Sequence, residues 1–116
     1  MEIKVIKNQN KITKDEIAII AREQFGNVVK AVVDIEQEIM AVGGDLHTDE
    51  KILLLKQENS NPEHLWGINL YPEMNEKKWI EFDSIINLQH PSGLRGIDHP
   101  EVQEKIRNIV KKLVSD

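Results

Sequence analysis

Cysteine is absent from this sequence of 116 residues. Disulfides, thiolate zinc sites, iron–sulfur clusters and cysteine nucleophiles are therefore excluded by composition. Any metal site would have to be built from histidine and carboxylate ligands. Proline and glycine are also scarce, with 4 and 6 residues, whereas 40% of the residues are hydrophobic and 30% are charged. This balance is typical of a folded protein, and the length predicts a single domain spanning residues 1–116.

Long apolar runs are missing as well. The run Ile52–Leu55 is far shorter than the ~20 residues that cross a bilayer, so we expect no membrane segment. The start of the chain lacks the apolar core and the small-residue cleavage site of a signal peptide, which predicts a cytoplasmic protein. The formal net charge is -5, and acids and bases are interspersed. Because this pattern offers no basic footprint, we expect no nucleic-acid partner.

Two segments carry the pattern of amphipathic helices. Thr13 and Glu16 have the capping-box spacing, and apolar residues follow at helical spacing until Gly26, which is placed to end the helix. Near the other end of the chain, Pro100 suits the first turn of a second helix. The apolar stripe after this proline consists of Val102, Ile106, Ile109, Val110 and Leu113. We expect both helices to pack on a sheet.

The other apolar segments favour strands. A short strand is expected at 3–6, a longer one rich in β-branched residues at 27–35, and a third at 39–42. We pair the second and third of these as a hairpin. Further strands are expected at 65–71 and 79–88, with a polar loop between them.

Residues 48–57 admit two interpretations. The polar start of this segment, at 48–50, could open a short helix. Alternatively, residues 51–56 form a strand that pairs with 65–71 across the turn-forming residues 58–62. We favour the strand. The predicted fold class is then α+β, a mostly antiparallel β-meander with two helices packed on one face.

With both helices on one face, the other face of the sheet would be bare. Its apolar residues would include Val28, Val32, Met40 and Val42. An uncovered apolar surface of this kind needs a partner. The sequence therefore predicts a homo-oligomer or a complex with another protein.

Three segments resemble a small uncharacterised prokaryotic family, a domain of unknown function. They are MAVGGDLH at 40–47, LWGINLYP at 65–72 and WIEFDS at 79–84. A Pro-Ser-Gly-Leu-Arg loop at 91–95 is loosely similar to the loop that precedes the last helix in that family. The resemblance spans nearly the whole chain. It implies a compact soluble domain and implies no activity.

Asp45, His47 and Asp49 form a polar constellation, because alternate positions of an extended segment project from one face. Two carboxylates and an imidazole could hold a divalent metal or act as an acid/base cluster. The simpler interpretation, which we favour, is that these residues are solvated or cap the backbone amides of a helix. No other cofactor is indicated, because the sequence has no phosphate-binding loop and no dinucleotide fingerprint.

Asp83 and Arg95 are further candidates for ligand binding. Asp83 shares a face of the expected last strand with Glu81 and would complete an acidic pocket beside His47 if the strands are neighbours. Arg95 could hold a carboxylate or a phosphate through two parallel hydrogen bonds. The predicted ligand-binding group therefore comprises His47, Asp45, Asp83 and Arg95.

Two functions are compatible with these features. The leading hypothesis is a soluble binding or interaction module without catalytic activity. The alternative is a metal-assisted hydrolase that uses His47 with Asp45, Asp49 and Asp83. The motifs of nucleophilic hydrolases, kinases and dehydrogenases are absent, so these classes have no support. No catalytic residue is assigned.

Overall fold

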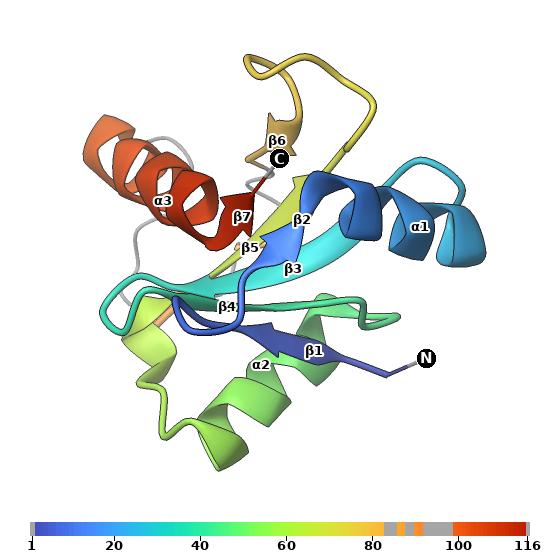
Figure 1. Cartoon of the computed structure of the whole chain (residues 1–116). Helices are drawn as coiled ribbons and strands as arrows, with labels where there is room; N and C mark the ends of the chain where they lie inside the picture. The colour runs from blue at the N-terminus through green and yellow to red at the C-terminus, as the bar shows by residue number, and fades with distance from the viewer. Residues whose placement is uncertain (1, 83–85, 88–89, 92–98, 116) are drawn as a thin grey trace.

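The computed structural model describes residues 2–82, 86–87, 90–91 and 99–115. Its elements are β1 (Lys4–Ile6), β2 (Ile12–Thr13), α1 (Lys14–Gln24), β3 (Val29–Asp34), β4 (Ile39–Val42), α2 (His47–Gln57), the short 3-10 helix η1 (Pro62–His64), β5 (Leu65–Leu70), β6 (Ile80–Glu81), α3 (Pro100–Leu113) and β7 (Val114–Ser115) (Figure 1). The predicted α+β class is confirmed. Within the described ranges, no helix is long and apolar enough to span a membrane.

Five strands form one antiparallel sheet in the order β1-β4-β3-β5-β6. The predicted hairpin of β3 and β4 is confirmed, with Val32 opposite Ala41. On its other side β3 pairs with β5, where Val32 lies opposite Gly67. The order is not that of a simple meander, because β1 joins the sheet beyond β4 and because α2 separates β4 from β5 in the chain. Strands β2 and β7 form a separate parallel pair.

Helix α1 begins and ends where the sequence predicts. The Thr13 hydroxyl accepts a hydrogen bond from the Glu16 amide, and the Glu16 carboxylate accepts one from the Thr13 amide, both at 3.0 Å. This reciprocal capping box satisfies two backbone donors that have no partner inside the helix. Gly26 follows the last turn with a φ of +96°, a conformation that a glycine adopts without steric cost.

Helices α1 and α3 pack on one face of the sheet (Figure 1). The predicted apolar stripe of α3 is confirmed, because Ile106, Ile109, Val110 and Leu113 are all buried. These residues share one core with Val29, Ala31 and Val33 of β3 and with Ile17, Ile20 and Ala21 of α1. Both tryptophans belong to this core.

Residues 47–57 form helix α2, so the favoured strand at 51–56 is wrong. The run Ile52–Leu55 does not alternate between two faces as a half-buried strand would, because Leu54 is buried and Ile52 is 44% exposed. Asp49 lies in the first turn, where a negative charge favours a helix. Asn59, just beyond the helix, has a φ of 54°. The turn-forming residues at 58–62 therefore end a helix and do not close a hairpin.

Helix α2 covers the face of the sheet opposite to α1 and α3 (Figure 1). Its Leu54 packs with Val32, Ala41 and Leu65, which point to this second face. The prediction that the helices leave one face bare is therefore wrong. This third layer was missed because the strand predicted at 51–56 is a helix.

The prediction of a homo-oligomer rested on a bare apolar face of the sheet, and α2 covers that face. Met40 and Val42, which the sequence interpretation placed on the bare face, lie in the core beneath α1 and α3. The register explains the difference, because Met40 lies opposite Val33 and Val42 lies opposite Ala31 across the hairpin. Residues opposite each other on neighbouring strands point to the same face.

The predicted strand at 79–88 is described in part, because residues 83–85 and 88 lie outside the described residues. β6 comprises Ile80 and Glu81, and residues 86–87 lie in a turn. The Asn87 side chain accepts from Gly67 N at 2.9 Å and donates to Gly67 O at 3.1 Å. An asparagine amide thus satisfies both backbone groups of Gly67 in β5.

We expect Ile106→Ala to lower the free energy of unfolding by about 2–5 kcal/mol, because Ile106 is fully buried between α3 and the sheet. Denaturant unfolding measures the change. Lys105→Ala, an exposed position on the same helix, should change it by less than about 0.5 kcal/mol. A loss of similar size in both variants would contradict the packing described for α3.

The two hydrogen bonds of Asn87 predict a pH signature. Asn87→Asp keeps the acceptor for Gly67 N but sets a carboxylate against Gly67 O, so we expect a loss of about 1–3 kcal/mol at neutral pH. Protonation at acidic pH restores a donor, and the deficit relative to wild type should shrink. Asn87→Ala should show a deficit that does not depend on pH. Identical pH dependence in the two variants would contradict the hydrogen bonds described between Asn87 and Gly67.

Candidate functional site

The predicted metal triplet lies at the start of α2 and is not an extended segment. Leu46 is the N-cap of the helix and His47 its first residue. The side chains therefore follow the helical period, and Asp45 and Asp49 are both exposed. Within the part of the chain that the structure describes, no three His, Asp or Glu side chains come together in a group that could hold a metal ion.

His47 is half-buried against the sheet. Its Nε2 lies 2.9 Å from the carbonyl oxygen of Ile68, an acceptor, so Nε2 carries the proton of this hydrogen bond. Burial lowers the pKa of the imidazole, and the hydrogen bond to Ile68 opposes this shift. This contact fastens the first turn of α2 to β5. Gly67 makes the approach possible, because a Cβ at this position would meet Ile86 and crowd His47.

Asp45 holds the turn between β4 and α2 and is not aimed at His47. Its carboxylate accepts a hydrogen bond from Gln24 at 3.2 Å, and its backbone oxygen accepts one from Lys30 Nζ at 2.7 Å. Asp83 and Arg95, the other two predicted ligand-binding residues, lie outside the described residues. Among the described members of the predicted group, Asp45 and His47 bind different partners, and the grouping with Asp83 and Arg95 stays a prediction.

Glu50 is a buried acid that the sequence interpretation missed. Its Oε2 accepts a hydrogen bond from Gly44 N at 2.9 Å, while Oε1 is buried without a hydrogen-bond partner. Burial raises the pKa of this carboxyl to about 9. Glu50 is therefore neutral at physiological pH. It stabilises the Gly43–Gly44 bend by satisfying a buried amide.

The close approach of Glu50 explains the second glycine of this bend. A Cβ at Gly44 would lie 2.8 Å from Cγ of Glu50. Gly43 has a φ of +91°, which other residues rarely adopt. Nothing in the sequence distinguished Glu50 from its exposed neighbour Asp49 as a buried acid.

A hollow of about 430 Å³ lies on the opposite side of the sheet. Its walls are α3, the start of α1, β6 and β7, and its lining includes Lys14, Trp79, Ile80, Arg107, Lys111 and Val114. We call this hollow the α3 groove. The indole of Trp79 is 8% exposed, so it belongs both to the core and to the floor of the groove.

Three cations from two helices line the α3 groove, and two of them lie over aromatic rings. Lys14 Nζ lies 5.0 Å from the ring centroid of Trp79, and the Arg107 guanidinium lies 4.9 Å from that of Phe82. Arg107 and Lys111 are one helical turn apart on α3 and line the same wall. Rings beneath the cations hold them in place through cation–π attraction. The groove therefore offers positive charge above an apolar floor.

Comparison with known proteins identifies the family. Residues 4–113 match the family described as "Protein of unknown function (DUF5674)". The chain belongs to the DUF5674 family. The predicted resemblance to a domain of unknown function is thus confirmed. No curated protein and no solved structure matches the chain.

In this DUF5674 chain, the groove was not evident from the sequence. Its three cations lie at 14, 107 and 111, and its indole lies at 79. The single local signal was the spacing of Arg107 and Lys111, which puts two cations on one face of the last helix. The contribution of Lys14 and Trp79 depends on how α1 and β6 pack beside α3.

The buried Glu50 predicts how stability changes with pH. A carboxyl whose pKa is higher in the folded state contributes stability that is lost as the pH rises from the unfolded pKa through the folded pKa, here from 4.5 to about 9. Glu50→Gln removes this titration. We expect the free energy of unfolding of wild type to fall relative to that of the variant by up to about 1.4 kcal/mol per pH unit over this window.

Denaturant unfolding measures this difference at steps of about half a pH unit between about pH 5 and pH 8.5. Glu23→Gln is the control, because Glu23 is exposed on α1. Its difference from wild type should stay flat. If Glu50→Gln is equally flat, the carboxyl of Glu50 is ionised in the folded protein and the buried neutral acid is ruled out.

Proposed function

We propose that this DUF5674 chain is a binding module without catalytic activity and that it binds an anionic ligand in the α3 groove. The observation that carries the proposal is the convergence of Lys14, Arg107 and Lys111 on a hollow with an aromatic floor. A volume of about 430 Å³ lies in the range of pockets that hold small ligands or a few side chains.

The chemistry of the groove supports binding. Arg107 Nη1 lies 3.6 Å from a Glu104 carboxylate oxygen, and exposed pairs of this kind are weak enough for a ligand carboxylate to compete. Arginine binds carboxylates and phosphates with two parallel hydrogen bonds, which gives direction as well as charge. The apolar floor supplies burial for the uncharged part of a ligand.

Several observations favour a binding role over catalysis. Burial shifts the pKa of His47, Glu50, Lys51 and His90, and none of these four residues lines the α3 groove. Shifted groups of this kind are expected beside reacting atoms in enzymes. The hydrolase alternative required the triplet at 45–49 to converge, and its extended geometry is replaced by a helix start.

Benzoate is a suitable probe for the proposed site, and benzamide is its neutral control of nearly equal shape. We expect benzoate to shift the indole N–H signal of Trp79 in the NMR spectrum of the ¹⁵N-labelled protein. The shift should saturate with added benzoate and give a Kd on the order of 1 mM. Trp66, whose indole Nε1 is buried, serves as an internal reference. The affinity should fall with added salt.

Matched variants test whether the groove cations are responsible. Lys111→Gln and Arg107→Gln should each weaken benzoate binding roughly two- to fivefold. Lys105→Gln should leave binding unchanged, because Lys105 is on α3 but does not line the groove. If benzamide binds as well as benzoate, or if benzoate leaves Trp79 unmoved, the proposed site is wrong.

A further inference from the structure

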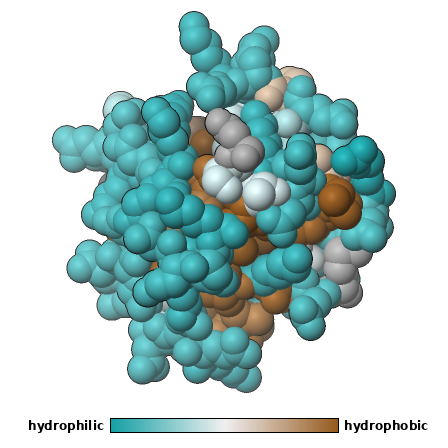
Figure 2. Space-filling view, in the orientation of Figure 1, coloured by the Kyte–Doolittle hydropathy of each residue, from teal (hydrophilic) through white to brown (hydrophobic). Residues whose placement is uncertain are grey.

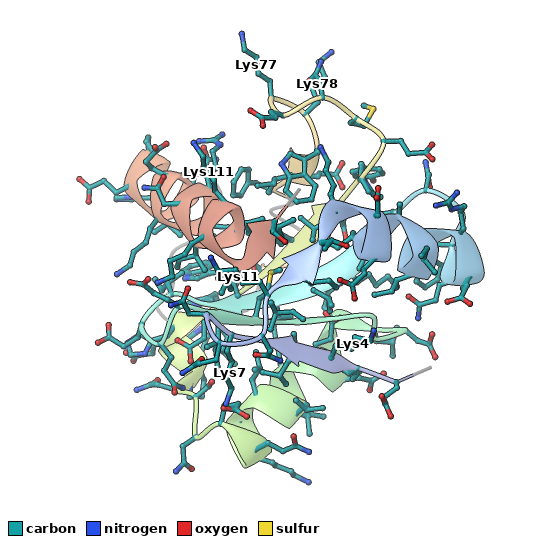
Figure 3. The ribbon with its side chains drawn as sticks, in the orientation of Figure 1. Lys4, Lys7, Lys11, Lys77, Lys78 and Lys111 are labelled. Atoms are coloured by element: carbon teal, nitrogen blue, oxygen red, sulfur yellow. The ribbon has the colours of Figure 1, made fainter. Side chains whose placement is uncertain are left out.

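Exposed lysines continue the positive charge beyond the α3 groove on both sides. Lys77 and Lys78 lie directly between the groove residues Glu76 and Trp79 in the chain. On the other side, Lys11 precedes β2, which pairs with β7 beneath the groove. Figure 3 shows Lys77 and Lys78 at the top of the view, Lys111 lower and to the left on α3, and Lys11 nearer the middle. The positive charge therefore covers a longer track than the hollow itself.

The lysines of this track have no acidic partner in the part of the chain that the structure describes. The ion pairs found there join Lys7 to Glu58, Lys112 to Glu38 and Arg107 to Glu104. Lys11, Lys77, Lys78 and Lys111 are exposed and belong to none of these pairs. In a chain with a net charge of -5, unpaired lysines gathered along one track mark a surface complementary to an acidic partner.

The floor of the groove suits one apolar side chain of such a partner. Trp79, Ile80 and Val114 contribute to it. In Figure 2, hydrophobic residues are visible along the middle of this face, with hydrophilic residues on both sides. A ligand that combines negative charge with a single apolar anchor matches this arrangement, because the anchor is buried while the charges stay on the wet rim.

Acidic residues on the same rim favour a peptide over a nucleic acid. Glu76 and Glu104 line the groove together with the cations. A phosphodiester backbone carries a negative charge at every unit and would be repelled at both positions. A peptide can place neutral backbone N–H donors against these carboxylates and its own acids against the lysines.

We infer that the occupant of the α3 groove is an acidic peptide segment of a partner protein, laid along the track from Lys77 and Lys78 to Lys11 with one aromatic side chain over Trp79. This inference rests on the proposed function of the groove. The molecule measures 34 × 30 × 25 Å. At roughly 3.3 Å per residue, an extended peptide of about nine residues spans this face.

The test uses isothermal titration of the full chain with a blocked synthetic peptide of about nine residues, Asp and Glu around one central Phe. Its controls are the same peptide with Asn and Gln in place of the acids, oligothymidylate of similar length, and benzoate. We expect the acidic peptide to bind at least about tenfold more tightly than benzoate, because it adds charge contacts outside the hollow. The neutral peptide should bind no more tightly than benzoate.

Two variants report on the track separately from the hollow. One is the double variant Lys77→Gln and Lys78→Gln, and the other is the single variant Lys11→Gln. Each should weaken binding of the acidic peptide roughly two- to fivefold per lysine and leave benzoate binding unchanged. Lys56→Gln is the matched control, because Lys56 is an exposed lysine in the last turn of α2 on the other face. This variant should change the affinity for neither ligand.

The outcomes separate the two proposals. If benzoate binds but the acidic peptide gains nothing over the neutral one, the groove is an anion site and the peptide inference is overturned. If the track variants weaken both ligands equally, the track adds no contacts of its own, and the inference is again overturned. Tighter binding of oligothymidylate than of the acidic peptide would assign the surface to nucleic acid instead. If neither benzoate nor the peptide binds, the proposed function fails as well.

Discussion

Strand β3 lies at the centre of the sheet and needs cover on both of its faces. Its burial pattern shows five of six residues buried, with Lys30 half-buried. Val29, Ala31 and Val33 contact the core beneath α1 and α3, while Val32 packs with Leu54 of α2. A strand buried on both faces cannot be stable in a two-layer protein, because one apolar face would stay in water. The three-layer arrangement, and with it the position of the α3 groove, depends on this burial.

Two asparagine side chains form hydrogen bonds with strand backbone groups, one at β5 and one at the end of β1. Asn87 makes two hydrogen bonds with Gly67 of β5, and Asn10 donates to Val5 O and accepts from Lys7 N at the end of β1. Strands with free backbone groups invite pairing with other chains. The asparagine amides satisfy these particular backbone groups within the chain.

The two outer layers of the molecule have different chemistry. On the α2 side, neutral Glu50 and half-buried His47 hold the bend after β4 and the first turn of the helix against the sheet. Burial of the Glu50 carboxyl lowers stability at neutral pH, and the bend with its buried Gly44 amide is what this acid supports. On the α3 side, cations stand over aromatic rings at the surface. The α2 layer thus holds buried polar groups against the sheet, whereas the α3 layer carries the groove that we propose as the ligand site.

The sequence by itself determined the elements that depend on neighbours in the chain. The capping box of α1, the apolar stripe of α3 and the β-branched run of β3 are all local patterns, so each element was predicted correctly. The run Ile52–Leu55 has no clear period, and its identity as a helix was decided by the second face of β3, which needed Leu54 as cover. Likewise, Lys14, Trp79 and Arg107 are far apart in the chain and meet only because α1, β6 and α3 pack together. A groove made of such distant side chains exists only in the tertiary structure, since no local pattern in the sequence encodes their contact.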